Sequence, residues 1–112
     1  MRRGEVWWVR FGPASGGEIA KRRPAVIVSN DASNRHLNRL QVVPLTSSTE
    51  RVYPSEALVT VRRRRSKAAA DQLTTVAKPR LAGRLGRLSD EDLRAVEEAI
   101  RVQLGLPDGS DR

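Results

Sequence analysis

A short apolar run, PAVIVS at residues 24–29, constrains the fold of this 112-residue chain more than any other segment. It is rich in β-branched side chains and begins with Pro24, which is typical of a strand buried on both faces. A strand of this kind needs neighbours on each side. The sequence offers further strand-like segments at residues 4–11, 40–47, 56–61 and 68–77.

Five or six short strands at such close spacing predict a mainly β fold, a small and strongly bent antiparallel sheet or barrel. The connections are predicted as a turn at 12–18, a loop or helical turn at 30–38, and a turn within RRRRSK at 62–67. Pro44 lies inside one predicted strand and cannot donate a ladder hydrogen bond, so it places that strand at an edge or a bulge.

The segment LSDEDLRAVEEAIRVQLGLP predicts a C-terminal helix at about 89–104. Ser89 is a natural N-cap, and Asp92 three residues later completes a capping box. Gly105 provides a helix stop. We expect one domain over 1–106 and a flexible tail over 107–112. The apolar stripe that should pack on the sheet is Leu93, Val96, Ile100 and Leu104.

Charge is distributed unevenly along the chain, whose formal net charge is +8. Residues 1–87 hold 18 Lys and Arg against 6 Asp and Glu, whereas residues 88–112 hold 3 against 7. Most of the cations are Arg, which favours planar, bidentate recognition of phosphate. A basic body beside an acidic end therefore indicates a polyanionic partner.

Several classes of site are excluded by composition. The chain has no Cys and a single His, His36, so disulfides, thiol nucleophiles, His/Cys metal sites and a two-histidine acid/base pair cannot form within it. It carries no phosphate-binding or dinucleotide glycine motif. We expect no metal and no cofactor. The absence of a signal-like or membrane-spanning segment predicts a soluble, cytoplasmic protein.

Arg23 and Thr46 are the two candidates for phosphate chemistry. Arg23 precedes a proline, which forces an extended conformation and a fixed position at the start of a strand. Thr46 ends another strand in the hydroxyl run TSST. Each also has an ordinary reading: Arg23 as a surface cation, and Thr46 as a turn cap.

The order of blocks GEVWWV, GGE, RRPAVIVSND, VVPLTSS and ADQLTTV, followed by the terminal helix, resembles the MazF/PemK toxins. The resemblance runs from about Gly4 to Leu106, and RPAVIVSND is its most specific part. It implies a compact SH3-like barrel with appended helices, and a homodimer whose RNA groove crosses the subunit interface. It also implies a cognate acidic antitoxin resembling MazE.

The resemblance implies a sequence-specific, metal-independent endoribonuclease, an mRNA interferase that cleaves single-stranded RNA. Its products are 2′,3′-cyclic phosphate and 5′-hydroxyl ends. The family's catalytic arginine and threonine fall on Arg23 and Thr46. Glu18 matches an acidic residue of the first loop, and Asp71 with Gln72 matches the family's DQ pair.

Two departures separate this chain from the PemK branch of the family. Ala69 stands where that branch has an arginine, and Gly17 stands where it has a histidine. A mechanism that needs those two residues cannot operate here, which leaves Arg23 and Thr46 as in the MazF branch. The base that takes the 2′-hydroxyl proton stays open among Glu18, Asp71 and Arg23.

RNA-binding positions are expected around these residues: Lys21, Arg22, Ser47, Gln72, Arg62, Arg63, Arg64 and Arg65. The four consecutive arginines form either a solvated turn or a clamp for the phosphate backbone. Trp7 and Trp8 are adjacent and should point to opposite faces of a strand, one into the core and the other toward a base or a dimer interface.

Two other functions fit the same composition. A basic barrel could bind nucleic acid without hydrolysis, or poison a protein target as the structurally related gyrase-directed toxins do. A degenerate toxin kept as a partner-binding scaffold is a third reading. Intact RNA after long incubation with the protein would identify either of these.

Overall fold

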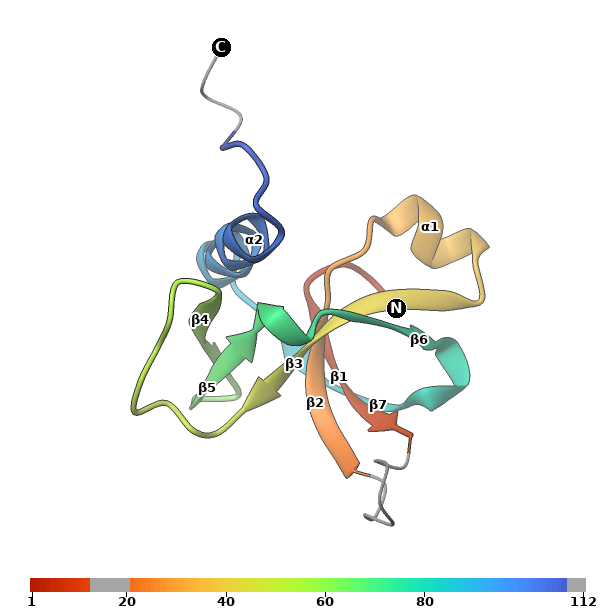
Figure 1. The fold of residues 1–112 in the computed structure, drawn as a ribbon. Helices are drawn as coiled ribbons and strands as arrows, with labels where there is room; N and C mark the ends of the chain where they lie inside the picture. The colour runs from red at the N-terminus through yellow and green to blue at the C-terminus, as the bar shows by residue number, and fades with distance from the viewer. Residues whose placement is uncertain (13–20, 109–112) are drawn as a thin grey trace.

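The computed structural model describes residues 1–12 and 21–108, which form a seven-stranded antiparallel sheet with a C-terminal helix (Figure 1). The strand order is β4-β5-β3-β2-β1-β7, with β6 pairing with β3 beside this path. The strands are β1 (Glu5–Phe11), β2 (Lys21–Ile27), β3 (Arg39–Thr46), β4 (Glu56–Val61), β5 (Arg64–Ala69), β6 (Thr74–Ala77) and β7 (Leu81–Arg87). The helices are α1 (Asp31–His36), α2 (Asp90–Leu104) and the short 3₁₀ turns η1 (Ala70–Gln72) and η2 (Lys78–Arg80).

The central strand β2 is buried on both faces, as its apolar run predicts. Ala25, Val26 and Ile27 are all fully buried. Ala25 and Ile27 join one hydrophobic cluster with Leu40 of β3, while Val26 points to the other side. The predicted mainly β architecture is therefore confirmed, with a strand more than expected.

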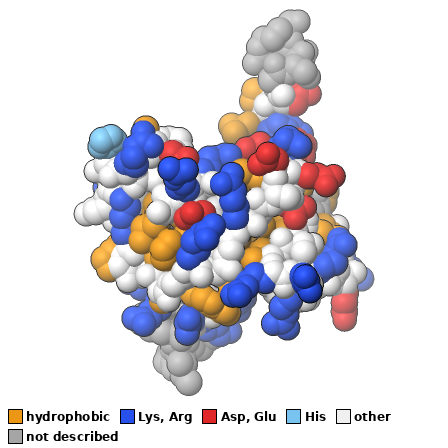
Figure 2. Space-filling model, turned by 180° about the vertical axis from the view of Figure 1, so that it is seen from behind, with side chains coloured by type: hydrophobic (Ala, Val, Ile, Leu, Met, Phe, Trp, Pro, Cys, Tyr) orange, Lys and Arg blue, Asp and Glu red, His pale blue; other side chains and the backbone are white. Residues whose placement is uncertain are grey.

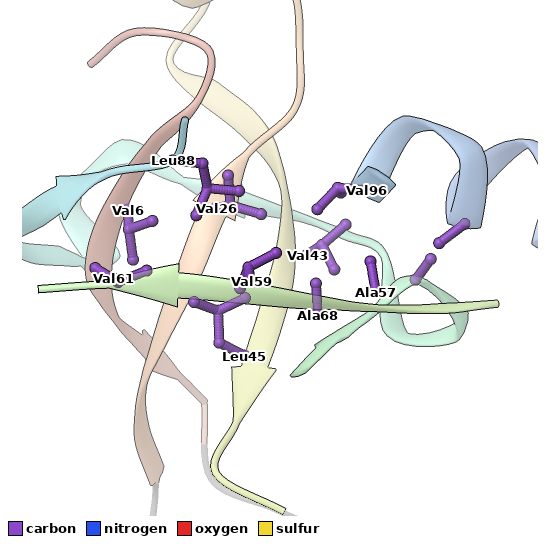
Figure 3. Close-up of a cluster of buried hydrophobic side chains, with 12 residues drawn as sticks. Val6, Val26, Val43, Leu45, Ala57, Val59, Val61, Ala68, Leu88 and Val96 are labelled. Carbon is purple, nitrogen blue, oxygen red and sulfur yellow. The ribbon is translucent and has the colours of Figure 1, made fainter. Parts of the chain in front are cut away.

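The larger hydrophobic cluster fills the space between the sheet, the β4–β5 hairpin and α2 (Figure 3). Val26 and Val43 enter it from the central strands, Val59 from β4 and Val96 from the helix. Each apolar side chain of this size contributes about 1.5–3 kcal/mol when it is fully buried. This cluster is what fixes the hairpin against the rest of the sheet.

Helix α2 begins where the sequence predicts. The Ser89 hydroxyl accepts a hydrogen bond from the Asp92 amide at 3.0 Å, and Gly105 ends the helix in the left-handed conformation with φ 67°. The Asp92 carboxylate accepts from the Thr60 amide of β4 at 2.9 Å, so it ties the helix to the sheet. Leu104 departs from the prediction: it is 54% exposed and lies beyond the core stripe.

Two predicted boundaries are wrong in the region after β4. The single strand predicted over 68–77 is broken by η1 into the end of β5 and the separate strand β6. Arg64 and Arg65, predicted as part of a turn, belong to β5. The two strands pair with different parts of β3: β5 with Leu45 and Thr46, and β6 with residues 39–42.

Strand β7, LAGRLGR, was not predicted at all. It has no β-branched residue and two glycines, so its local propensity for a strand is low. It forms because it pairs with β1, with register shifts around Trp7. Tertiary pairing has overridden propensity here.

The predicted edge position for Pro44 is wrong, because β3 is a central strand that pairs with β2, β5 and β6. Pro44 instead lies between Val42, the last residue paired with β6, and Leu45, the first residue paired with β5. A missing amide hydrogen costs little at this gap. Pro24 likewise is the fourth residue of β2 and not its first.

The β4–β5 hairpin closes through a two-residue turn, Arg62–Arg63, next to the last ladder pair of Val61 with Arg64. Both turn residues have positive φ, 51° and 68°. Such a turn strongly prefers Asn-Gly, because left-handed backbone costs other residues about 1–2 kcal/mol each. Two arginines are therefore held in a conformation that their residue type disfavours.

Candidate active site

The site lies where β2 and β3 separate. Their ladder runs from Ile27–Val42 to Ala25–Pro44 and stops there. Two steps further in the same register Arg23 and Thr46 would face each other, but the ladder between β2 and β3 has ended, and Thr46 pairs with Lys67 of β5 on the other edge of β3. A cleft of about 1050 Å³ opens at this divergence, and both Arg23 and Thr46 line it.

Arg23 is half-buried and is held within a strand by neighbours on β1. Its Cα partner is Val9, which is fully buried, and the following Pro24 pairs with Trp8. Among residues 1–12 and 21–108 the Arg23 guanidinium has no acidic or hydrogen-bonding partner. The backbone of Arg23 is thus held by the strand, and its guanidinium is available to a ligand.

Thr46 is the last residue of β3, and its hydroxyl oxygen accepts a hydrogen bond from the Ser48 amide at 3.3 Å. This is the turn-capping bond expected of a hydroxyl at a strand end. A hydroxyl that accepts one bond still has its proton to donate. Capping therefore orients Thr46 without using up its donor.

The cleft is strongly basic. Among the described residues that line it there is no Asp or Glu, and Ser47 and Ser66 add hydroxyls to its rim. The Arg22 guanidinium lies 4.8 Å from the centre of the Trp8 ring, an orientation that stabilises the cation above an aromatic face. No group of three or more His, Asp or Glu side chains that could hold a metal occurs in the described part of the chain. The six cations that line the cleft are Lys21, Arg22, Arg23, Arg62, Arg64 and Arg65.

A second, smaller hollow of about 260 Å³ lies beside the first, and Lys21 and Arg23 line both. Gln72 lines this second hollow with Phe11. Asp71 lines neither hollow; it is exposed on η1. Glu18 lies outside the described residues. Of the predicted DQ pair, Gln72 therefore lines the smaller hollow, whereas Asp71 does not line either one.

The two adjacent tryptophans take opposite sides of β1, as predicted. Trp7 packs against the smaller hydrophobic cluster, and its indole donates to the Glu5 carboxylate at 3.0 Å. Trp8 lines the cleft. His36 is exposed on α1 and is not among the residues that line the site.

Leu85 and Ser66 also line the cleft, and sequence reasoning missed both. Leu85 comes from β7, the strand that propensity does not reveal. Ser66 follows the arginine run, inside the region predicted as a turn. Its position on β5, opposite Val59, gives it a fixed place that local sequence could not indicate.

The chain is similar in sequence to known proteins over nearly its whole length. Residues 2–104 match the family described as the PemK-like, MazF-like toxin of type II toxin-antitoxin systems. The chain is 40% identical to the endoribonuclease MazF9 of Mycobacterium tuberculosis, over 95% of this chain and 98% of that one. It is 33% identical to the endoribonuclease toxin MazF of Escherichia coli K12, over 91% of this chain and 92% of that one.

Solved structures are similar in fold as well. A mycobacterial endoribonuclease bound to its cognate antitoxin superposes with a TM-score of 0.79 at 29% identity, covering 96% of this chain and 97% of that one. In the described residues no helix is long and apolar enough to cross a membrane. With a family match over nearly the whole length and a fold shared with its members, this chain belongs to the PemK-like, MazF-like family of type II toxins.

Proposed function

We propose that this protein is an endoribonuclease, the toxin of a type II toxin–antitoxin system, and that it cuts single-stranded RNA in the basic cleft. The observation that carries the proposal is the meeting of Arg23 and Thr46 in one cleft lined by six cations. Family membership supports it, since relatives of similar length are named endoribonucleases.

The chemistry rearranges bonds within the RNA and needs no co-reactant. The 2′-oxygen attacks the adjacent phosphorus as its proton passes to a general base, the bond from phosphorus to the 5′-oxygen breaks, and the leaving 5′-oxygen takes a proton from a general acid or from water. The products are a 2′,3′-cyclic phosphate and a 5′-hydroxyl. The phosphorane formed on the way carries an extra negative charge, and stabilising that charge is the protein's main task.

Arg23 suits this task as a fixed cation. A guanidinium stays protonated near neutral pH, so Arg23 donates hydrogen bonds to the phosphorane oxygens and does not act as a base. Thr46 donates its hydroxyl proton to a phosphate oxygen. The cationic lining also disfavours a divalent metal in the cleft, so we propose that cleavage is metal-independent.

An acidic antitoxin is the proposed regulatory partner. A structural relative is described in complex with its cognate antitoxin. In Figure 2, Lys and Arg side chains are spread over much of the visible face, and several Asp and Glu side chains gather toward the end of the molecule that carries the C-terminus. An acidic, extended segment in the basic cleft would compete with RNA for the same cations.

The proposal includes a cytoplasmic homodimer of a single domain over residues 1–106, as the family resemblance implies. Light scattering on the purified protein measures the dimer. A truncation after Leu106 should retain its fold and its cleavage activity, because α2 and its cap at Gly105 end before that point.

The central test is RNA cleavage in EDTA by the wild type and by Arg23→Ala, with both ends of the fragments mapped. We expect the wild type to leave cyclic phosphate and 5′-hydroxyl ends. Arg23→Ala should cut roughly 10²–10³-fold more slowly, the usual cost of removing one preorganised donor to a transition-state anion. Arg35→Ala, an exposed arginine on α1, serves as the matched control and should cut normally.

Two results would contradict the proposal. RNA left intact by the wild type, together with salt-sensitive binding, would identify a binding module. Undiminished cleavage by a correctly folded Arg23→Ala protein would remove Arg23 from the mechanism. Near-ultraviolet circular dichroism and thermal unfolding establish that the variant is folded.

A further inference from the structure

The turn of the β4–β5 hairpin combines an unfavourable backbone conformation with positive charge that no acidic side chain of the described residues neutralises. Arg62 and Arg63 both occupy positive φ in a two-residue loop, where Asn-Gly is the favoured pair. The charge itself is the feature that needs an explanation.

The turn is held close to β7 by a glycine. A Cβ added at Gly86 would lie 3.2 Å from a methyl of Val61 and 3.7 Å from Cγ of Arg62. The stem of Arg62 therefore rests against a residue without a side chain. This close approach directs the turn to the cleft, and Arg62, Arg64 and Arg65 line it.

The arginines of this hairpin have no acidic partner among the described residues. Glu56 on β4, the acid of the hairpin itself, pairs with Lys67 at 3.3 Å. The Asp92 carboxylate accepts from the Thr60 amide. Four consecutive cations thus repel one another with no counter-charge from the described protein, which is a surface suited to a polyanion.

We propose that the Arg62–Arg65 hairpin is a phosphate clamp that grips the RNA backbone away from the scissile bond, and that the strained turn is retained for this binding at the expense of fold stability. RNA is the occupant that the geometry favours, because the same cleft carries Arg23 and planar guanidinium groups match phosphate oxygens in pairs. The inference rests on the proposed function for the identity of its ligand.

If the hairpin is a clamp, one double substitution in its turn should raise the stability of the fold and weaken the binding of nucleic acid. Replacing the turn by its favoured pair, Arg62→Asn with Arg63→Gly, relieves the backbone and removes two charges. We expect Tm to rise by about 4 °C or more, since each relieved residue raises the stability of a chain of this length. We expect affinity for single-stranded nucleic acid to fall.

The binding test uses a mixed-sequence single-stranded oligodeoxynucleotide, which lacks the 2′-hydroxyl and cannot be cleaved by the proposed chemistry. The slope of log affinity against log salt should become shallower by about 0.7 or more, since Arg62 lines the cleft and each lost phosphate contact to a single strand contributes about 0.7. The charge-matched control is Arg35→Gln with Arg94→Gln, two exposed arginines outside the cleft, and its slope should match the wild type.

An unchanged salt slope in the Asn-Gly variant would overturn the clamp, and an unchanged or lower Tm would overturn the strained-turn argument. If the slope for the oligonucleotide were unchanged while an acidic peptide bound more weakly, the hairpin would be a protein-binding surface and the proposal would be wrong. The experiment does not depend on cleavage. Intact RNA with the wild type would contradict the proposed function while leaving the clamp measurable.

Discussion

Two side chains at this site make a structural contact and also line the cleft. Thr46 caps the turn after β3 through the Ser48 amide and still has a hydroxyl proton to donate. Arg22 covers the ring of Trp8 and also lines the cleft. The reading of Thr46 as a turn cap is therefore compatible with its proposed role at the phosphate, because one bond orients the group that makes the other.

Replacing Thr46 by valine keeps the shape of the side chain and removes its hydroxyl. Thr46→Val loses both the proton that it donates and the oxygen that accepts from the Ser48 amide, so we expect cleavage to slow by about 10–100-fold or more, the value of one hydrogen bond to a charged group plus the loss of the cap. Thr46→Ser keeps the hydroxyl and should retain most of the activity. The measurement is the initial rate of RNA cleavage at saturating protein, and equal rates for valine and wild type would contradict the assignment.

Among the elements, those defined by local signals were predicted well. The α2 start depends on a cap within three residues, and the β2 strand on a continuous apolar run, so both can be read from neighbouring residues. Strand β7 and the break at η1 depend on distant partners, namely β1 and two separate parts of β3. Local sequence carries little of that information.

The N-cap of α2 gives a prediction about stability. Ser89→Ala removes the acceptor of the Asp92 amide bond and should cost about 1 kcal/mol, or roughly 4 °C in Tm for a chain of this length. Ser89→Asn supplies another good cap and should restore most of the loss. Thermal unfolding followed by circular dichroism measures both, and a Tm equal to the wild type for Ser89→Ala would refute the role of the cap.

In the molecule as a whole, two carboxylates link the N-terminal segment to distant parts of the fold. Partial burial alone would raise the pKa of Glu5, but hydrogen bonds from the Trp7 indole and the Arg2 amide, with the nearby N-terminus and Arg84, hold it below its ordinary 4.5. The Arg3 amide, followed by the Asn34 side chain, lowers the pKa of Asp31 below its ordinary 3.8.

These lowered pKa values predict a loss of stability in acid. A carboxyl that is harder to protonate in the folded state contributes stability above its unfolded pKa, and this contribution disappears as pH falls through the folded value. The free energy of unfolding in urea should therefore decline below about pH 4.5. The variant Glu5→Gln with Asp31→Asn cannot titrate at these sites and should decline less steeply; parallel curves would show that neither carboxylate is linked to folding.

Residue types and local order were enough to predict a mainly β fold, the terminal helix and a polyanionic ligand, because apolar periodicity, capping and uneven charge are all local signals. Local sequence made Arg23 and Thr46 candidates, since Pro24 restricts Arg23 to an extended conformation, but the family resemblance assigned them to the phosphate. The cleft itself was decided only in three dimensions. It lies where the β2–β3 ladder ends, and Gly86 on an unpredicted strand lets an arginine turn approach. Pairings between residues far apart in the chain depend on the packing of the whole sheet, which no local stretch of sequence encodes.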